Sequence, residues 1–407
     1  MSLSSRWAAF WAAMAVSLAV WAAPVSQQQA LQRADAFLSA RGRTVAAQGL
    51  VQGHAAPCHN GVPAFYVFNA EEGGFVVLSG DDRTAPVLGF AERGVFSEES
   101  VPEGLQWLLQ MYGEQIDGLR ISENAPVAAG GRPACQAAPV RRNIEPLMAS
   151  LWNQGEPYNL LCPRYFNQDG SEGDRCATGC VATAVAQVMA FYRYPQATVR
   201  TIPGYVASFA TDQGEKKVQL RNIPSGSVLD WDNMLPVYHG GESEEQRMAV
   251  AQLMYWAGMA SKMAYGPSSA TYMSDALNGL VRYFGYDDGS HIEQRGSHTI
   301  ASWHNLLYSE ILAGHPVAFA GVNSGGAHAF VIDGYDVEGL FHLNWGWGGL
   351  DNGFFRLDVL DPDDSSGIGP RRSRGATTWG RRRSSCDCRM RWPPNRWRRA
   401  SRSTIGK

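Results

Sequence analysis

The chain has 407 residues, 45% of them hydrophobic, which is enough for two globular domains with sizeable cores. The formal net charge of −3 combines two unlike parts. Residues 1–370 carry 22 basic and 37 acidic side chains, whereas residues 371–407 carry 13 basic and one acidic. A basic segment usually suggests nucleic acid or an anionic surface as the partner. We interpret it differently below and expect no nucleic-acid partner.

Residues 1–23 have the pattern of a secretory signal peptide. One arginine precedes an apolar run from Trp7 to Ala23, which ends in small residues before Pro24. The run is too short to cross a bilayer comfortably, and an uncleaved membrane anchor is the alternative. No other segment is a transmembrane candidate. We therefore expect a secreted protein, extracellular or periplasmic, with no membrane contact after signal cleavage and with disulfides allowed.

Residues 24–137 are predicted to form a small α+β domain. Ser26 begins a sequence with capping-box spacing, and apolar residues at helical period continue it towards Gly42. The elements predicted after this helix are a hairpin over 64–80, a further strand pair over 87–96 and an amphipathic helix over 105–119. This domain contains no cluster of chemically useful residues.

A linker and a second domain follow. Residues 124–142 are rich in Ala, Pro and Gly and lack periodicity, which is typical of a linker that proteases can cut. The second domain, residues 138–370, begins with helices and ends with strands, an α+β order with an antiparallel sheet. Its predicted helices span 180–194, 245–263, 274–284 and 301–312, and its strands span 316–322, 328–335, 340–346 and 353–360.

The sequence CATGCVATAVAQVMAFY, residues 176–192, places Cys180 in the first turn of a helix. Thr178 or Gly179 can cap this helix. Unpaired backbone N–H groups and the positive end of the helix dipole favour a thiolate there, and the same N–H groups can bind an oxyanion. Taken alone, this stretch is explained equally well by a buried or disulfide-bonded cysteine.

Two other roles for these cysteines are weaker. Cys162, Cys176 and Cys180 could supply three sulfur ligands, but their spacing matches no common zinc pattern. A disulfide between Cys176 and Cys180 would have to form across the start of a helix. A disulfide between Cys162 and Cys176, which would join two loop segments, is the better candidate.

A thiolate nucleophile needs a base, and His328 stands out among nine histidines. It follows the flexible turn GVNSGGA and begins a predicted strand. If the hairpin that it enters is symmetric about Asp336, His328 lies opposite Asn344, with the two side chains on one face. A structural histidine in a sheet would explain His328 considered alone.

Five stretches of the sequence resemble the streptopain family, secreted bacterial cysteine proteases of papain-like fold. They are ATGCVATAVAQVM, NQGEPYNLLCP, AYGPSS, AHAFVIDGYD and HLNWGWGG. The resemblance extends from Ile144 to Asp361. Residues 24–137 are more loosely similar to the inhibitory propeptide of that family, mainly through GFVVLSGDDRTAPVLGF. The resemblance implies a papain-like α+β catalytic domain, with a helical part and an antiparallel sheet, preceded by its own inhibitor.

The resemblance also implies roles for single residues. Cys180 would be the nucleophile and His328 the general base. Four residues would support them: Trp345 and Trp347 as walls of the site, Asn344 or the backbone near Trp345 as the group that orients His328, and Gln294 as the oxyanion donor beside the N–H of Cys180. No cofactor and no metal are expected.

After Asp361 the resemblance stops. Residues 371–407 are rich in Arg, Ser, Pro and Trp and have no apolar periodicity. We interpret this tail as disordered or as the product of a reading-frame shift near Gly369. If the shift is real in the organism, a core strand is missing; if it is a sequencing error, the true enzyme is intact. A basic tail evolved to bind surfaces is the alternative.

The sequence therefore predicts a secreted cysteine endopeptidase made as an inactive precursor. Its partners would be protein or peptide substrates and its own propeptide, which acts as an intramolecular inhibitor. Two rivals stay open: a binding protein on the same scaffold that the altered C-terminus makes catalytically inactive, and a papain-like amidase or transferase that acts on small amides or cell-wall peptides.

Overall fold

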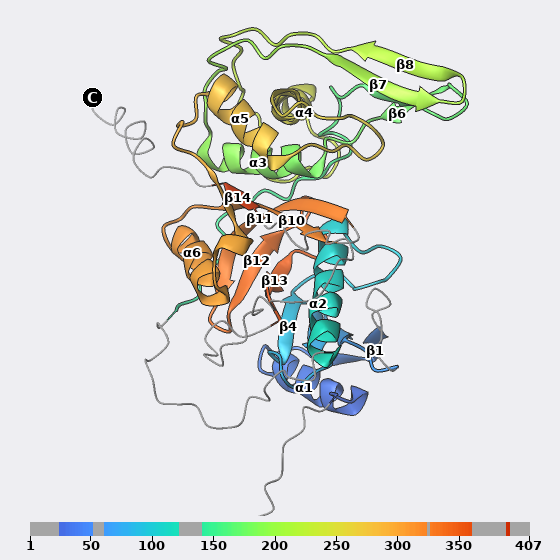
Figure 1. The fold of residues 1–407 in the computed structure, drawn as a ribbon, viewed down its shortest axis with the longest axis vertical. Helices are drawn as coiled ribbons and strands as arrows, with labels where there is room; N and C mark the ends of the chain where they lie inside the picture. Colours follow the sequence, from blue (N-terminus) through green and yellow to red (C-terminus); the bar gives the residue numbers. More distant parts are fainter. Residues whose placement is uncertain (1–23, 52–60, 122–140, 324–325, 360–387, 391–407) are drawn as a thin grey trace, which may run out of the picture.

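The computed structural model describes residues 24–51, 61–121, 141–323, 326–359 and 388–390 (Figure 1). The predicted signal peptide and most of the predicted linker lie outside these residues. The α-helices are α1 (Gln27–Ser39), α2 (Glu103–Ile121), α3 (Cys180–Tyr192), α4 (Glu244–Ala260), α5 (Met273–Phe284) and α6 (Ile300–Leu312). The strands are β1 (Val45–Val51), β2 (Phe65–Ala70), β3 (Phe75–Ser79), β4 (Val87–Ala91), β5 (Arg164–Phe166), β6 (Glu172–Arg175), β7 (Val206–Thr211), β8 (Gly214–Gln219), β9 (Ile292–Gln294), β10 (Val317–Asn323), β11 (Gly326–Asp336), β12 (Leu340–Asn344), β13 (Gly353–Phe355) and β14 (Cys388–Met390).

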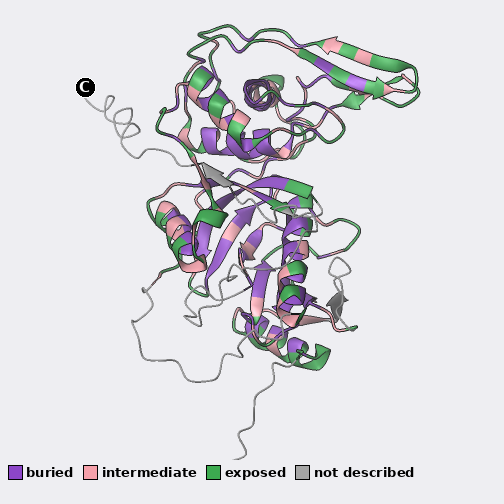
Figure 2. Cartoon of the chain, viewed as in Figure 1, coloured by how far each residue is buried: buried purple, intermediate pink, exposed green. Residues whose placement is uncertain are grey.

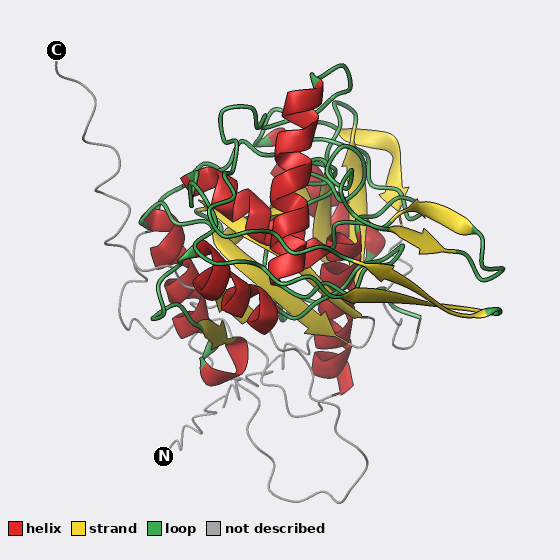
Figure 3. Cartoon of the chain, turned by 90° about the horizontal axis from the view of Figure 1, so that it is seen from above, coloured by secondary structure: helices red, strands yellow, loops and turns green. Residues whose placement is uncertain are grey.

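The chain folds into two lobes (Figure 1). Figure 3 shows the same chain from above, where the two lobes overlap. One lobe holds α3, α4 and α5 with the hairpin of β7 and β8. The other is built on a ten-stranded sheet in the order β1-β2-β3-β4-β13-β12-β11-β10-β14-β9. Helix α3 and the central strands are the most continuously buried parts of the molecule (Figure 2). The predicted α+β order of the second domain is confirmed.

The large sheet runs without interruption from the N-terminal unit into the C-terminal one, because β4 pairs antiparallel with β13. Gly89 on β4 is opposite Phe355 on β13. A Cβ on Gly89 would lie 2.2 Å from the Phe355 ring, so this close approach needs a glycine. The two units therefore share one sheet and one hydrophobic core, which the sequence did not reveal.

Strand β11 has a helix on each face. Phe330 and Ile332 pack in the core that contains α2 and α6, whereas Ala329 and Val331 pack in the core that contains α3. Since side chains alternate along a strand, His328 shares the face of Phe330 that α2 covers. This alternation places the predicted base on the face of the sheet that the N-terminal unit covers.

Most predicted elements of the N-terminal unit are confirmed. Ser26 and Gln29 form a capping box at the start of α1, and β2 and β3 form the predicted hairpin. The strand pair predicted over 87–96 is wrong, because only β4 forms. The chain then turns at Gly94, which has a φ of 87°, and Phe96 is held by hydrogen bonds of its backbone to the Asn69 side chain.

The end of the chain differs from the prediction in two ways. The strand expected over 353–360 ends at Phe355. Within the basic tail the structure describes residues 388–390, which form β14 between β10 and β9. The prediction of a disordered tail is therefore wrong for residues 388–390. The other residues of 371–407 lie outside the described part of the chain, and the proposed frame shift stays a hypothesis.

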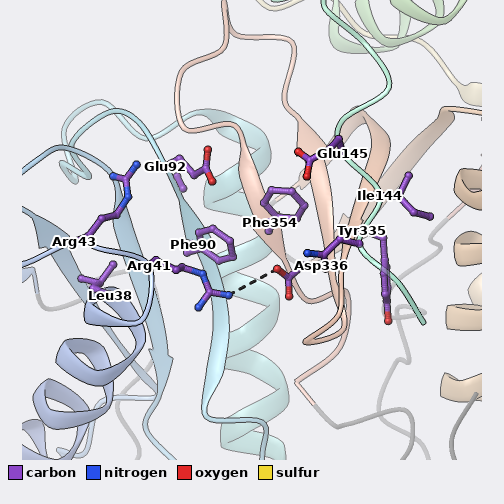
Figure 4. A pocket seen from close by; sticks show the side chains of 12 residues that line it. Leu38, Arg41, Arg43, Phe90, Glu92, Ile144, Glu145, Tyr335, Asp336 and Phe354 are labelled. Atoms are coloured by element: carbon purple, nitrogen blue, oxygen red, sulfur yellow. Dashed lines mark ion pairs between the residues drawn. The ribbon is translucent and has the colours of Figure 1, made fainter. Parts of the chain in front are cut away.

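A cavity of about 340 Å³ lies between the N-terminal unit and the start of the C-terminal one (Figure 4). Arg41 lines it and makes ion pairs with Asp336 at 3.7 Å and Glu338 at 3.1 Å. Neither Cys180 nor His328 lines this cavity. It belongs to the contact between the two units and not to the predicted catalytic site.

Candidate active site

Helix α3 begins at Cys180 because Gly179 supplies the turn that precedes it. Gly179 has a φ of 87° and is the N-cap residue, without a side-chain cap. This positive φ is the reason that the position needs glycine, and a Cβ there would also lie 3.0 Å from the Ser269 carbonyl oxygen. Thr178, the other predicted cap, is buried and shares a hydrogen bond with the Thr183 hydroxyl at 2.8 Å.

The thiol of Cys180 is partly buried and free. Burial raises the pKa of Cys180, a hydrogen bond with the Ala329 backbone lowers it, and the negative charge of Glu103 raises it again. The sequence predicted that the helix terminus would favour the thiolate. The backbone N–H groups of Cys180 and Val181 do lower the thiol pKa, but burial in this covered form raises it by more.

His328 is 2% exposed and lies on β11, directly opposite Gly321 of β10. Its Nε2 donates to the Trp345 carbonyl oxygen at 3.3 Å, which leaves the Nδ1 lone pair free to take a proton. Nδ1 has no hydrogen-bond partner among the described residues and lies 3.7 Å from Glu103 Oε2. Burial lowers the pKa of His328 to about 4, although the Trp345 hydrogen bond raises it.

Asn344 does not orient His328. The hairpin of β11 and β12 is irregular between Ile332 and Gly334, so Asn344 pairs with Val331 and not with His328. The Asn344 amide donates to the Ser150 carbonyl at 2.7 Å and accepts from the Gly346 N–H at 3.1 Å. The backbone of Trp345 contacts His328 instead, the option that the sequence had left open.

Trp345 is held firmly behind His328. Its indole Nε1 donates to the Asp351 carbonyl at 2.9 Å, and its backbone N–H donates to Asn352 Oδ1 at 3.0 Å. Its ring meets Phe330 edge to face with centroids 5.0 Å apart. Trp347 is partly buried in the following turn and packs on the core that contains α2. Trp345 thus fixes both a wall of the site and the carbonyl that orients the imidazole.

Asp351 gives a test of the loop that holds Trp345. It is 3% exposed, has a φ of 55°, and its Oδ1 has no hydrogen-bond partner among the described residues. Burial raises the pKa of Asp351 to about 6. The folded carboxyl therefore holds its proton more tightly than an exposed one, whose pKa is about 3.9. The contribution of Asp351 to the free energy of unfolding is therefore greatest at low pH and is lost as the pH rises from about 4 to about 6.

We expect Asp351→Asn to stabilise the folded precursor by about 2 kcal/mol at pH 7, because the amide carries no charge to bury. Asparagine also tolerates a positive φ. Urea unfolding at pH 7 and pH 4 measures the effect, and the gain should vanish at pH 4, where the carboxyl of Asp351 is protonated. Equal stability of the two proteins at pH 7 would contradict this account.

Gln294 lies away from the pair. It ends β9, is exposed, and is opposite Cys388 of β14. Three strand spacings separate β9 from the strand of His328, which corresponds to about 14 Å across the sheet. The sequence position assigned to the second oxyanion donor is therefore not supported by the fold.

Gln154, which the sequence analysis did not single out, lies much closer. Its carbonyl accepts from the Thr178 N–H at 3.1 Å, just before Cys180. Two residues earlier the Trp152 carbonyl accepts from the Gly348 N–H at 2.9 Å, in the turn after Trp345. The segment 152–154 thus joins the cysteine side of the site to the histidine side. Its sequence signal was present in the stretch NQGEPYNLLCP.

The other cysteine roles receive no support from the geometry. Cys162 and Cys176 are buried and free, and burial raises the pKa of each to about 12. The disulfide considered between them is therefore not formed. Among the described residues no group of three or more His, Cys, Asp or Glu side chains could hold a metal ion. Of these three cysteines, Cys180 combines partial exposure, a helix terminus and a hydrogen bond with the backbone of Ala329, the residue that follows His328.

Comparison with known proteins agrees with this geometry. Residues 152–355 match the family model described as Peptidase C10 family, and residues 22–116 match the model described as Spi protease inhibitor. Streptopain of Streptococcus pyogenes serotype M1 is 36% identical over 302 residues, which cover 73% of this chain and 74% of streptopain. The chain belongs to the peptidase C10 family.

Two further proteins are similar to this chain, and one of them was solved as a proenzyme. The thiol protease/hemagglutinin PrtT of Porphyromonas gingivalis is 30% identical over 73% of this chain and 34% of its own length. Prointerpain A of Prevotella intermedia, solved as a fragment, has a TM-score of 0.64 and 29% identity, covering 86% of this chain and 98% of the fragment. This C10 peptidase is thus a papain-like cysteine protease made as a zymogen with an inhibitor domain at its N-terminus.

The inhibitor domain of this C10 peptidase covers the candidate pair with the start of α2. A Cβ on Gly104 would lie 2.5 Å from Trp345 Cε3 and 2.6 Å from His328 Cδ2. One residue earlier, the Glu103 carboxylate faces His328 Nδ1, the atom that would otherwise take the proton of a thiol. The site is therefore described in its covered form.

Glu103 also offers a test of the covered site. We expect Glu103→Gln to speed alkylation of Cys180 in the uncut precursor about 2- to 5-fold near pH 8, because it removes a negative charge that raises the thiol pKa. The effect is small because the Glu103 side chain is 57% exposed and water screens it. Glu99→Gln, an exposed change outside the site, is the control. An unchanged rate in Glu103→Gln would rule out the charge effect.

Proposed function

We propose that Cys180 and His328 are the catalytic pair of this peptidase. One arrangement supports the proposal most strongly: the thiol contacts the backbone of Ala329, and the preceding residue is a buried histidine whose Nδ1 has no hydrogen-bond partner among the described residues. The Trp345 carbonyl fixes the imidazole tautomer, so that Nδ1 is the basic atom.

The chemistry follows from these positions. His328 Nδ1 takes the proton of Cys180, and the thiolate attacks the carbonyl carbon of a peptide bond. The oxyanion is bound by the backbone N–H of Cys180 and by a second donor, for which Gln154 is the candidate. His328 then protonates the leaving amine, and water hydrolyses the thioester with His328 again acting as the base.

The inhibitor domain is proposed to act on its own catalytic domain. Gly104 packs on His328 and Trp345, and Glu103 takes the place of the thiolate beside Nδ1. Burial of both groups favours the neutral thiol and the neutral imidazole, as the pKa directions of Cys180 and His328 indicate. Removal of α2 would return water to the pair and let the thiolate and imidazolium form.

Maturation and export complete the proposal. Residues 1–23 would direct secretion, and no helix among the described residues is long and apolar enough to cross a membrane. A cut between 124 and 142 would then separate the inhibitor, residues 24–137, from the catalytic domain, residues 138–370. Sequencing the N-terminus of the secreted and processed protein tests both points, because it must begin after residue 124.

The function is tested by digestion of an unfolded protein with the processed enzyme and with two variants. Cys180→Ala should abolish hydrolysis, and His328→Ala should lower kcat/KM at least about 10³-fold, with circular dichroism showing both folded. Full activity of either folded variant would overturn the assignment. Turnover of small amides without protein digestion would instead favour the amidase.

A further inference from the structure

One face of β10 and β11 carries His328 and is covered by α2. Gly321 on β10 is directly opposite His328, and Phe319 is opposite Phe330 in the same hairpin. Because opposed residues share a face and alternate residues return to it, all four lie on the side that α2 covers. Phe319 and Phe330 pack with ring centroids 5.0 Å apart. The face is thus apolar immediately beside the predicted base.

Trp107 of the inhibitor domain fills the space above Gly321. A Cβ on Gly321 would lie 2.0 Å, 2.3 Å and 2.5 Å from three atoms of the Trp107 indole. The indole is 5% exposed, and its centroid is 5.9 Å from that of Phe330. The glycine therefore leaves room for a whole aromatic ring. The occupant belongs to α2, the helix that also carries Glu103 and Gly104 onto the site.

The position of this space relates it to the substrate, on the proposed function that Cys180 and His328 catalyse peptide hydrolysis. His328 protonates the leaving amine, so the residues after the scissile bond must lie over the strand of His328 and not over α3. Gly321 faces His328 across the hairpin, and opposed side chains are about 5 Å apart. When α2 leaves, the space above Gly321 opens on the leaving-group side.

We infer that Gly321 and Phe330 form a subsite for a large aromatic side chain on the leaving-group side of the scissile bond. In the precursor Trp107 occupies this subsite as a stand-in for the substrate. Gly321 is the residue that determines specificity, because any larger side chain there would fill the space that the ring needs. Aromatic residues are preferred since the walls are apolar and present ring edges and faces.

Acyl transfer measures this subsite separately from hydrolysis. The processed enzyme is acylated with a short peptide ester and offered tryptophanamide, phenylalaninamide or alaninamide in place of water. The amine nitrogen attacks the thioester carbonyl, a C–N bond forms, the C–S bond breaks, and the amine proton passes to His328 while the thiolate leaves. We expect the two aromatic amides to capture the acyl group about tenfold better than alaninamide, the scale expected of one apolar pocket.

Variants assign the preference to Gly321. Gly321→Ala is made together with Trp107→Ala, so that the new methyl group does not meet the indole during folding, and is compared with Trp107→Ala alone. In the double variant, the ratio of acyl capture by the aromatic amides to capture by alaninamide should fall to near one. Val322→Ala, a partly exposed change that faces the other side of β10, is made in the same background and should keep the preference.

The outcomes are distinct. Equal capture of aromatic amides and alaninamide by the wild-type enzyme would overturn the subsite while ester hydrolysis still upholds the proposed function. No hydrolysis of the ester would overturn both. A preference that survives Gly321→Ala would place the subsite elsewhere. If neither variant folds, the ratio of acyl capture by aromatic amides to capture by alaninamide in the wild-type enzyme alone decides whether the subsite exists.

Discussion

Replacing Gly104 with alanine should weaken the cover over the site and make Cys180 of the uncut precursor reactive. The new Cβ would lie 2.5 Å from Trp345 Cε3 and 2.6 Å from His328 Cδ2, and both are ring atoms with little room to move. Overpacking of this kind costs about 1–3 kcal/mol, which corresponds to an opening of the α2 contact about 5- to 150-fold more frequent. The rate of Cys180 alkylation in short incubations reports that opening.

The same helix offers a matched control. Gly118 also lies in α2, and nothing lies within 4 Å of a Cβ built on it. Gly118→Ala should leave the alkylation rate unchanged or lower it, since alanine favours a helix by about 1 kcal/mol over glycine. Equal rates for the two alanine variants would show that the Gly104 contact does not keep the site covered.

A second large effect is expected at Gln154. Removing one donor of an oxyanion hole lowers kcat about 10²- to 10³-fold, so Gln154→Ala should lower kcat of the processed enzyme by about this factor with little change in KM. Gln294→Ala, an exposed change at the far edge of the sheet, should leave kcat within about twofold, as most surface changes do.

The pair of variants separates two explanations of the site. A large loss in Gln294→Ala together with normal kcat in Gln154→Ala would restore the residue expected from the sequence. Loss of binding in Gln154→Ala without loss of kcat would indicate that Gln154 contacts the substrate but not the oxyanion. The thermal unfolding of both variants should match the wild type, because neither side chain is fully buried.

The elements that the sequence predicted well are those with local signals. The helix that begins at Cys180 could be placed because a glycine precedes a run of apolar residues at helical period, and α1 could be placed from its capping box. The fold class followed from similarly compact motifs, and the catalytic roles of Cys180 and His328 remain predictions that rest on the resemblance to the family. Helix ends were less certain: α4 ends at Ala260, three residues before the predicted end.

The failures depend on contacts between distant segments. The register of β11 and β12 shifts near Asp333, which is fully buried and accepts from His342 Nδ1 at 2.6 Å and from the Met148 N–H at 2.9 Å. The prediction assumed a symmetric hairpin without this shift, and it therefore placed Asn344 wrongly opposite His328. The pairing of β4 with β13 and the position of Gln154 likewise arise only in the folded chain.

Labelling with an epoxide inhibitor of cysteine proteases tests most directly whether Cys180 and His328 form a catalytic pair that the N-terminal domain covers. The precursor and its processed form are treated in parallel and mapped by peptide mass analysis. We predict labelling at Cys180 alone, at least about tenfold faster after processing, and lost in His328→Ala. Rapid labelling of the uncut precursor, labelling at Cys162 or Cys176, or no labelling of a folded processed enzyme would contradict it.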